Sequence, residues 1–312
     1  MITTVTLNPA IDRAYVINDF KPNKKYHIHV DDVKITAGGK GLNVARVTSI
    51  LGEKVNATGF LGGYSGKFIE EELEKLDIYT SFVQINESSR IFTAIVDPLN
   101  NTETIVAEKG PVVTKKELNA FVKEFIKILK YSEIIVAAGS VPKGLPKTIY
   151  GDMVKIAKDN NVRMIIDVRG NYLEEAIKAK PFMIKPNLEE LEELVGYKLD
   201  SDYKIIFECK HICKQGIDVV GISLGDEGAI FVTKEGAYKV CAPKAAAINS
   251  VGCGDAFVAG FAVSIYRENN LEEAFKMAVA AGTANVIEDR IGYVNLEWVE
   301  KFYKEIKVMR LE

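Results

Sequence analysis

Cysteine and histidine are scarce in this chain of 312 residues, which has four cysteines and three histidines. The cysteines are too few and too scattered for a disulfide framework, so we expect reduced thiols at Cys209, Cys213, Cys241 and Cys253. Cys209, His211 and Cys213 do not have the spacing of a zinc site. No histidine stands beside an evident nucleophile, which argues against Ser-His-Asp and Cys-His catalysis. A catalytic base has to be sought among other residue types.

Long apolar runs and a strong net charge are also missing. No stretch of about 18 residues is free of charged side chains, and the N-terminus lacks the basic and apolar regions of a secretory signal. The formal net charge of −3 gives no footprint of binding to nucleic acid or to an anionic membrane surface. We therefore expect a cytoplasmic protein whose partners include neither nucleic acid nor a membrane.

Repeats, low-complexity tracts and linkers are absent too, so we expect a single domain over residues 1–312. Apolar strand-like runs alternate with amphipathic helices. The expected strands are 2–7, 55–62, 132–139, 162–168, 181–186 and 217–225, and the expected helices are 42–51, 66–76, 115–130, 146–160, 187–196 and 201–216. Runs such as IIVAAG and VVGISL lack polar alternation, which is typical of parallel strands buried on both faces. The pattern predicts an α/β fold with a doubly wound, mainly parallel sheet flanked by helices.

Two segments, residues 13–36 and 91–107, interrupt the alternation. Both have the composition of antiparallel strands, and the second contains a turn-forming PLNN stretch at 98–101. They predict either a small antiparallel sheet that covers one edge of the main sheet or an ordinary hairpin extension. A covering sheet with exposed edges would also offer a surface for dimerisation.

The stretch AGGKGLNVARV, residues 37–47, has three glycines and Lys40 before a helix whose first turn carries Asn43. Glycines let the backbone approach a ligand closely, and a lysine can meet an anion. The alternative is a tight turn that caps a helix. Common phosphate loops are missing, because no G-x-G-x-x-G follows the first strand and GGYSGKF has Phe68 where a Walker A loop needs Ser or Thr.

The stretch SVGCGDAFVAG, residues 250–260, combines glycines with a carboxylate where a helix begins. Backbone N–H groups of Gly252, Cys253 and Gly254 would form an anion pocket with partial positive charge. Asp255 can accept a proton from a hydroxyl group placed in line with a phosphoryl group, and phosphoryl transfer needs little more than such positioning and charge stabilisation. The alternative is that Asp255 only caps the helix.

These two motifs, in this order and spacing, resemble those of the ribokinase-like, or PfkB, carbohydrate kinases, and the resemblance spans nearly the whole chain. The phosphosugar branch, which contains 1-phosphofructokinase and tagatose-6-phosphate kinase, is the most similar. Its motifs here are TVTLNPAIDR at 4–13, Arg90, AGSVPKG at 138–144, IKPNLEEL at 184–191, ISLGDEGA at 222–229 and GYVNLE at 292–297. The resemblance implies ATP and Mg²⁺ as cofactors, and a β lid that closes over the sugar and joins a homodimer.

The resemblance also implies roles for individual residues. On the sugar side, the hydroxyl groups would be held by Asp12, Gly38, Gly39 and Asn43. The phosphate already on the sugar would be bound by Lys40 and Arg90, and Ser140 would contact the substrate. On the nucleotide side, Lys185 would reach the ATP phosphates, and Asn187 and Glu190 would organise magnesium through water. The nucleotide site would be lined by Ser223, Gly225 and Gly228, and Asn285 would pack on the adenine. Glu190 has an alternative interpretation as part of a solvated acidic helix face.

Two positions depart from the family pattern. Cys253 replaces the usual Ala or Ser, and we expect the helix terminus to acidify its thiol so that oxidation inhibits the protein. Residues 167–170 read DVRG instead of D-x-S-G, which adds the charge of Arg169 near the site. The implied reaction is phosphorylation of a ketohexose phosphate, D-fructose 1-phosphate first and D-tagatose 6-phosphate as the alternative. A non-catalytic phosphosugar or nucleotide sensor is the competing class.

Overall fold

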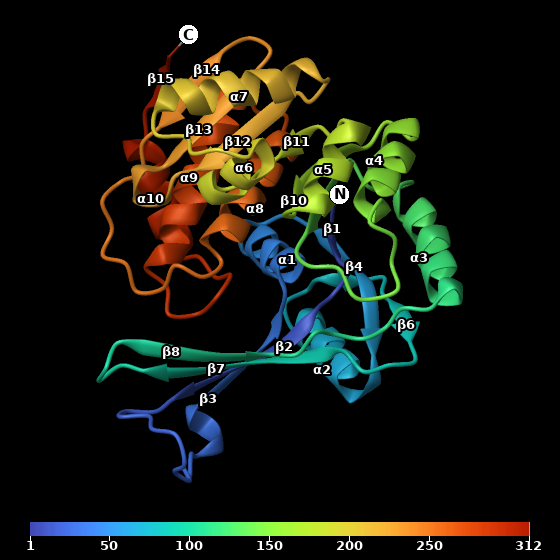
Figure 1. Cartoon of the computed structure of the whole chain (residues 1–312), viewed down its shortest axis with the longest axis vertical. Helices are drawn as coiled ribbons and strands as arrows, with labels where there is room; N and C mark the ends of the chain where they lie inside the picture. The colour runs from blue at the N-terminus through green and yellow to red at the C-terminus, as the bar shows by residue number, and fades with distance from the viewer. Residues whose placement is uncertain (312) are drawn as a thin grey trace.

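Two β-sheets organise the chain, and the computed structural model describes residues 1–311 (Figure 1). The strands of the larger sheet are β1 (Ile2–Thr6), β4 (Val55–Gly62), β5 (Tyr79–Thr80), β6 (Val83–Ile85), β9 (Ile134–Ala138), β10 (Arg163–Asp167), β11 (Met183–Ile184), β12 (Val219–Ser223), β13 (Ala229–Thr233), β14 (Ala237–Val240) and β15 (Val308–Arg310). Their order in space is β15-β14-β13-β12-β11-β10-β9-β1-β4-β5, and β6 pairs with β4.

The central part of the larger sheet is parallel, from β5 through β4, β1, β9, β10 and β11 to β12. Strand β1 lies between β4 and β9, so the chain builds the sheet first to one side of β1 and later to the other. Open α/β sheets bind ligands outside the carboxyl ends of the strands at such a switch point. The mainly parallel, doubly wound sheet is therefore confirmed, and its topology points to the carboxyl ends of β1, β9 and β10.

Beyond β12 the sheet continues with three antiparallel strands that the sequence pattern did not predict. Strands β13 and β14 form a hairpin whose short turn follows Thr233. Strand β15 has three residues and comes from the end of the chain. Segments this short carry too little periodicity to be recognised from the sequence, and they are identified by their pairing, β13 with β12, β14 with β13 and β15 with β14.

Helices cover both faces of the larger sheet (Figure 1). The α-helices of the described residues are α1 (Lys40–Ile50), α2 (Gly63–Glu74), α3 (Lys115–Ile128), α4 (Ile149–Asp159), α5 (Asn171–Ala179), α6 (Leu188–Val195), α7 (Asp202–Lys214), α8 (Cys253–Tyr266), α9 (Leu271–Val286) and α10 (Leu296–Glu305). Ile135 of β9 packs in the apolar cluster of α3 and α4, whereas its neighbour Val136 packs in that of α1 and α8. Burial on both faces explains why these strands show no polar alternation. None of the helices in residues 1–311 has the length and hydropathy of a membrane-spanning segment.

The smaller sheet consists of β2 (Ala10–Val16), β3 (Val33–Gly38), β7 (Arg90–Asp97) and β8 (Thr102–Ala107), and Figure 1 shows it extending away from the main body. Each predicted segment gives an antiparallel pair, β2 with β3 and β7 with β8, and the turn at 98–101 is confirmed. Strands β2 and β7 join the two pairs in parallel. The expectation of strand throughout 13–36 is wrong for residues 17–32, where only a 3-10 turn at Val30–Asp32 is regular.

Candidate active site

The carboxylate of Asp255 lies buried in the first turn of α8, beside α1. Gly252, with a φ of 88°, is the residue that caps this helix, and Asp255 stands inside it. Oδ2 of Asp255 accepts a hydrogen bond of 2.8 Å from Nδ2 of Asn43. The interpretation of Asp255 as a plain N-cap is therefore wrong, because its carboxylate turns to a neighbouring helix. The first-turn N–H groups of α8 have no acceptors within their own helix and remain available to an anion.

Burial raises the pKa of Asp255 to about 7, and the nearby charge of Asp167 adds to the rise. Lys40, the hydrogen bond from Asn43 and the charge of Lys185 act in the opposite direction. A carboxyl group whose pKa lies near neutrality can take up a proton and release it again at pH 7. Asp255 therefore has the electrostatic setting of a general base.

Two lysines share the carboxylate of Asp167, the last residue of β10. Nζ of Lys40 lies 3.4 Å from both carboxylate oxygens, and Nζ of Lys185 lies 3.3 Å from Oδ1. The Asp167 side chain is 1% exposed and that of Lys185 is 4% exposed, whereas that of Lys40 is 43% exposed. The charge of Asp167 raises the pKa of Lys40. Two cations and one anion thus surround the proposed base.

Asp167 is a site residue that the sequence motifs did not predict, since it entered them only as the first residue of DVRG. The signal for it was its position. An acidic residue directly follows the buried run of β10, at the carboxyl edge where ligands of open α/β sheets collect. Lys40, for its part, is the first residue of α1, so the helix begins two residues earlier than the expected 42–51.

The two cations predicted to share the sugar phosphate have different neighbours. Lys40 contacts Asp167, whereas Arg90 lines a cavity of about 520 Å³ between the β6–β7 and post-β8 loops. Nε of Arg90 donates to the carbonyl oxygen of Asn8 at 3.2 Å, and Nδ2 of Asn8 donates to Oγ of Ser140 at 3.1 Å. Arg90 and Ser140 are thus brought together through Asn8, a residue that was not assigned a role from the sequence.

Asp12 in β2 packs against Gly38 in β3 so closely that a Cβ atom at Gly38 would lie 2.0 Å from Oδ2 of Asp12. A larger residue at position 38 would displace the Asp12 carboxylate, and Gly39 with its φ of 114° leads directly into α1. Burial raises the pKa of Asp12 to about 6, and the charges of Arg90 and Arg46 oppose this rise. The predicted sugar-binding residues of β2, β3 and β7 therefore lie on neighbouring strands of the smaller sheet.

Asn187 and Glu190 form a capping box at the start of α6. Oδ1 of Asn187 accepts from the N–H of Glu190 at 2.7 Å, and Oε2 of Glu190 accepts from the N–H of Asn187 at 3.0 Å. Glu190 is half-buried, so it is not simply part of a solvated acidic face. No cluster of three or more acidic, histidine or cysteine ligands occurs within residues 1–311. Magnesium keeps much of its water shell, so these two side chains fit an ion held mainly through water.

Three of the remaining nucleotide-side residues lie at or just after the carboxyl end of β12, and the fourth, Asn285, lies at the end of α9. Ser223 forms a backbone bridge with Asn187, and Gly225 with a φ of 63° follows it. At Gly228 a Cβ atom would lie 2.1 Å from the carbonyl oxygen of Val240, so this position also requires glycine. Asn285 is buried at the end of α9, where its Nδ2 donates to the carbonyl oxygen of residue 293 at 2.7 Å. Asn285 therefore anchors the loop that follows α9.

The thiol of Cys253 is not acidified. Burial raises the pKa of Cys253 to about 12, and the neighbouring charge of Asp255 pushes it in the same direction. The expected influence of the helix terminus is outweighed, so the predicted acidic thiol is wrong. The thiol instead faces the carbonyl oxygen of Asn249, with Sγ at 3.7 Å.

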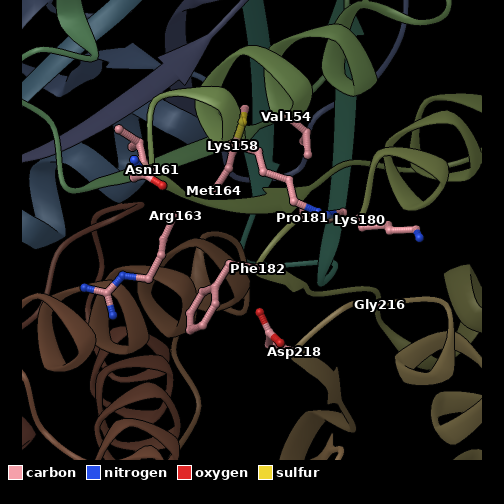
Figure 2. A pocket seen from close by; sticks show the side chains of 11 residues that line it. Val154, Lys158, Asn161, Arg163, Met164, Lys180, Pro181, Phe182, Gly216 and Asp218 are labelled. Atoms are coloured by element: carbon pink, nitrogen blue, oxygen red, sulfur yellow. The ribbon is translucent and has the colours of Figure 1, made fainter.

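A second cavity, of about 270 Å³, opens at the amino ends of the parallel strands, opposite the carboxyl ends where Asp167 lies. It is lined by the start of β10, and Figure 2 shows Arg163 and Lys180 extending to opposite sides of Phe182. Asp167 ends the same strand that Arg163 begins. This cavity therefore lies across the sheet from Asp255 and takes no part in the site described above.

Comparison with known proteins finds relatives along nearly the whole chain. The family model described as pfkB family carbohydrate kinase matches residues 5–291. A tagatose-6-phosphate kinase of Staphylococcus epidermidis is 38% identical over 317 residues, covering 100% of both chains. A solved structure from Thermotoga maritima, titled a possible 1-phosphofructokinase, is 30% identical with a TM-score of 0.87 and covers 100% of this chain and 99% of its own.

The tetrameric inhibited form of phosphofructokinase-2 from Escherichia coli is also similar, with 25% identity, a TM-score of 0.89 and coverage of 97% of this chain and 98% of its own. These matches run through both sheets and include the glycine-rich starts of α1 and α8. The chain belongs to the pfkB family of carbohydrate kinases.

Proposed function

We propose that this protein is an ATP-dependent phosphosugar kinase that converts D-fructose 1-phosphate to D-fructose 1,6-bisphosphate. The observation that carries the proposal is the buried carboxyl group of Asp255, which has a pKa of about 7. It lies in the first turn of α8, where the N–H groups of the helix can bind an anion. A general base of this kind contributes roughly 10²–10⁴-fold to a proton-transfer step.

In the proposed reaction Asp255 takes the proton of the acceptor hydroxyl group as its oxygen forms a bond to the γ-phosphorus of ATP. The bond from that phosphorus to the bridging oxygen breaks, and ADP leaves. The first-turn N–H groups of α8 and the ammonium group of Lys185 stabilise the charge on the moving phosphoryl group. Proximity supports this role of Lys185, because a Cβ atom at Gly254 would lie 3.5 Å from its Nζ.

ATP would lie along the carboxyl end of β12, against Ser223, Gly225 and Gly228. Asn187 and Glu190 would hold magnesium through water molecules, and the ion would neutralise charge on the ATP phosphates. The capping box supports this assignment, because each side chain uses one oxygen within the protein and retains further acceptor capacity for water.

The acceptor needs a second cationic site for the phosphate that it already carries. Arg90 and the cavity beside it supply that site in the proposal, and Asp12 and Asn43 hold sugar hydroxyl groups. D-tagatose 6-phosphate is the second candidate substrate, favoured by the 38% identity to a tagatose-6-phosphate kinase along the full chain. Both sugars are ketohexoses with one phosphate group.

The test is ADP release with Mg-ATP and, side by side, D-fructose 1-phosphate, D-tagatose 6-phosphate and D-fructose 6-phosphate. We expect D-fructose 1-phosphate to give the highest kcat/KM. Asp255→Asn should lower kcat roughly 10²–10⁴-fold. The control is Asp218→Asn, the same change at the far edge of the sheet. Sugar binding without turnover in the parent protein would instead indicate a sensor, and a higher kcat/KM with the tagatose ester would reverse the order of the substrates.

We further propose that the smaller sheet forms a homodimer contact. Its edge strand β8 is exposed along its whole length and carries Ile105 and Val106, and unpaired edges of this kind favour association. The tetrameric form of the similar Escherichia coli enzyme supports an oligomer. Sedimentation of the parent protein and of Val106→Lys tests this contact: the parent should be a dimer and the variant a monomer, whereas a monomeric parent would contradict it.

A further inference from the structure

Arg46, in the middle of α1, is the largest fully buried side chain of the described residues and is only 2% exposed. Its Nη1 donates to Oδ1 of Asn43 at 3.0 Å and to the carbonyl oxygen of Ile291 at 3.2 Å, and its Nη2 donates to the carbonyl oxygen of Ala37. The guanidinium group also lies 4.9 Å from the centre of the Tyr293 ring. Three separate parts of the chain, α1, β3 and the loop after α9, therefore meet at one cation.

This cation is buried without a matching carboxylate. Within residues 1–311 no acidic group lies at ion-pair distance from Arg46, and its Nε has no hydrogen-bond partner. Burial lowers the pKa of Arg46, and the Tyr293 ring and the more distant charge of Asp12 only partly offset that effect. A buried charge of this kind is costly, and an apolar side chain of similar volume would fill the space without that cost. Packing alone does not account for an arginine here.

The hydrogen bonds of Asn43 identify what the arginine does. A guanidinium group can only donate, so the Asn43 atom that faces it has to be the carbonyl oxygen Oδ1. The amide nitrogen Nδ2 is then left to face Asp255, to which it donates at 2.8 Å. The opposite amide orientation would place Oδ1 against the carboxylate and Nδ2 against the guanidinium group, so that acceptor would face acceptor and donor would face donor. Gly292 makes room for this side chain, since a Cβ atom at Gly292 would lie 2.8 Å from Cβ of Asn43.

We propose that Arg46 is a positioning residue of the kinase reaction, which fixes the Asn43 amide so that it donates to the carboxylate of Asp255. The inference rests on the proposed function, because it assigns a consequence to the base of that reaction. Arg46 touches neither substrate nor base. It acts through Asn43, and it ties the orientation of the base to strand β3 of the smaller sheet and to the loop at 287–295.

The consequence for catalysis is a pH effect with a defined sign. The charged groups that act on Asp255 are Asp167 at the end of β10, Lys40 in α1 and Lys185 after β11. Arg46 is not among them, so its influence passes through the Asn43 hydrogen bond, which lowers the pKa of Asp255. Loss of the guanidinium group releases the amide, weakens that hydrogen bond and raises the pKa of the base. On the low-pH side of a plot of kcat/KM against pH, activity falls as the base of the free enzyme becomes protonated. This part of the profile, the acid limb, then moves to higher pH.

The test compares the pH dependence of kcat/KM in the parent and in Arg46→Met, with ADP release as the assay. We expect the acid limb to move to higher pH by about one unit. At pH values below the pKa of the base this shift is about a tenfold loss of kcat/KM, and at pH values well above that pKa the loss is much smaller. Arg46→Lys should show a smaller shift, since one ammonium group can still donate to Asn43 Oδ1. The matched control is Arg163→Met, which removes a guanidinium group lying 5.6 Å from the centre of the Phe182 ring at the far edge of the sheet.

A double-variant cycle tests the route through Asn43. In an Asn43→Leu background, Arg46→Met should move the limb much less than in the parent, because the amide that it orients is gone and only its direct effect on the pKa of Asp12 remains. A limb that stays in place in Arg46→Met, with kcat/KM lowered equally at every pH, would overturn the inference and leave a purely structural role. A full shift in the Asn43→Leu background would overturn it as well.

The folded state of each variant is checked from its thermal midpoint. If Arg46→Met does not fold, Arg46→Lys carries the test, and a limb identical to that of the parent then contradicts the inference. Failure of the proposed function looks different. In that case Asp255→Asn keeps its turnover, whereas failure of this inference alone leaves Asp255→Asn inactive and the Arg46 profiles unshifted.

Discussion

Replacing Asp167 by asparagine removes the carboxylate that Lys40 and Lys185 share, and it tests two effects of that charge, one on stability and one on the pKa of Asp255. The substitution keeps the size of the side chain and lets an amide fill the space. Lys185, which is 4% exposed, loses its carboxylate partner at 3.3 Å. Lys40 loses its partner at 3.4 Å, but its side chain is 43% exposed and water screens much of the change.

The expected loss of stability comes mainly from Lys185. Removing one partner of a buried ion pair costs about 3 kcal/mol, because it leaves an uncompensated buried charge. The exposed pair with Lys40 adds less than about 1 kcal/mol. For a chain of this size a loss of about 3 kcal/mol lowers Tm by roughly 5–10 °C. The substitution also changes the titration of Asp255, because the charge of Asp167 raises the pKa of that carboxyl group. Removing the charge lowers this pKa, so the acid limb of the kcat/KM profile moves to lower pH.

The assays are the urea midpoint, Tm and the pH profile of kcat/KM, each measured on Asp167→Asn and on the control Asp218→Asn. Asp218 pairs with Lys234 at 3.1 Å, but both side chains are more than half exposed, so the control should lose less than about 1 kcal/mol. An Asp167→Asn variant as stable as the parent would refute the argument from buried charge. An acid limb that moved to higher pH would refute the assigned electrostatics of Asp255.

Two further predictions concern the start of α8. Gly252→Ala should lower the free energy of unfolding in urea by about 1–2 kcal/mol, because φ is 88° and the new Cβ atom would lie 2.8 Å from a backbone nitrogen. Gly254→Ala should be close to neutral, because its new Cβ atom would meet only the end of a lysine side chain at 3.5 Å. Equal losses in the two variants would contradict the backbone argument. The Cys253 thiol should resist alkylation by iodoacetamide at pH 7.5, because burial raises its pKa to about 12, while the exposed Cys241 reacts first. Mass spectrometry of the labelled peptides distinguishes them, and labelling of Cys253 as fast as that of Cys241 would contradict the raised pKa of the buried thiol.

The sequence alone determined the parts of this protein that depend on local rules. The alternation of buried apolar runs with amphipathic helices predicted the parallel sheet, because a strand covered on both faces needs apolar side chains at every position. Glycine-rich stretches marked the starts of α1 and α8, because positions such as Gly39 and Gly252 require backbone angles that other residues rarely adopt. The PLNN turn between β7 and β8 followed in the same way from local turn chemistry.

The tertiary structure decided which side chains act together. Asn43 reaches Asp255 across 212 positions of the chain, and Lys40 reaches Asp167 across 127. No periodicity or spacing encodes such a partner, because these hydrogen bonds and ion pairs exist only once α1, α8 and β10 have packed at the same edge of the sheet. The burial that raises the pKa of Asp255, and that keeps the Cys253 thiol protonated, arises from the same packing. Local sequence therefore specified the elements and their glycine-rich ends, while packing set the charges and contacts of the candidate site.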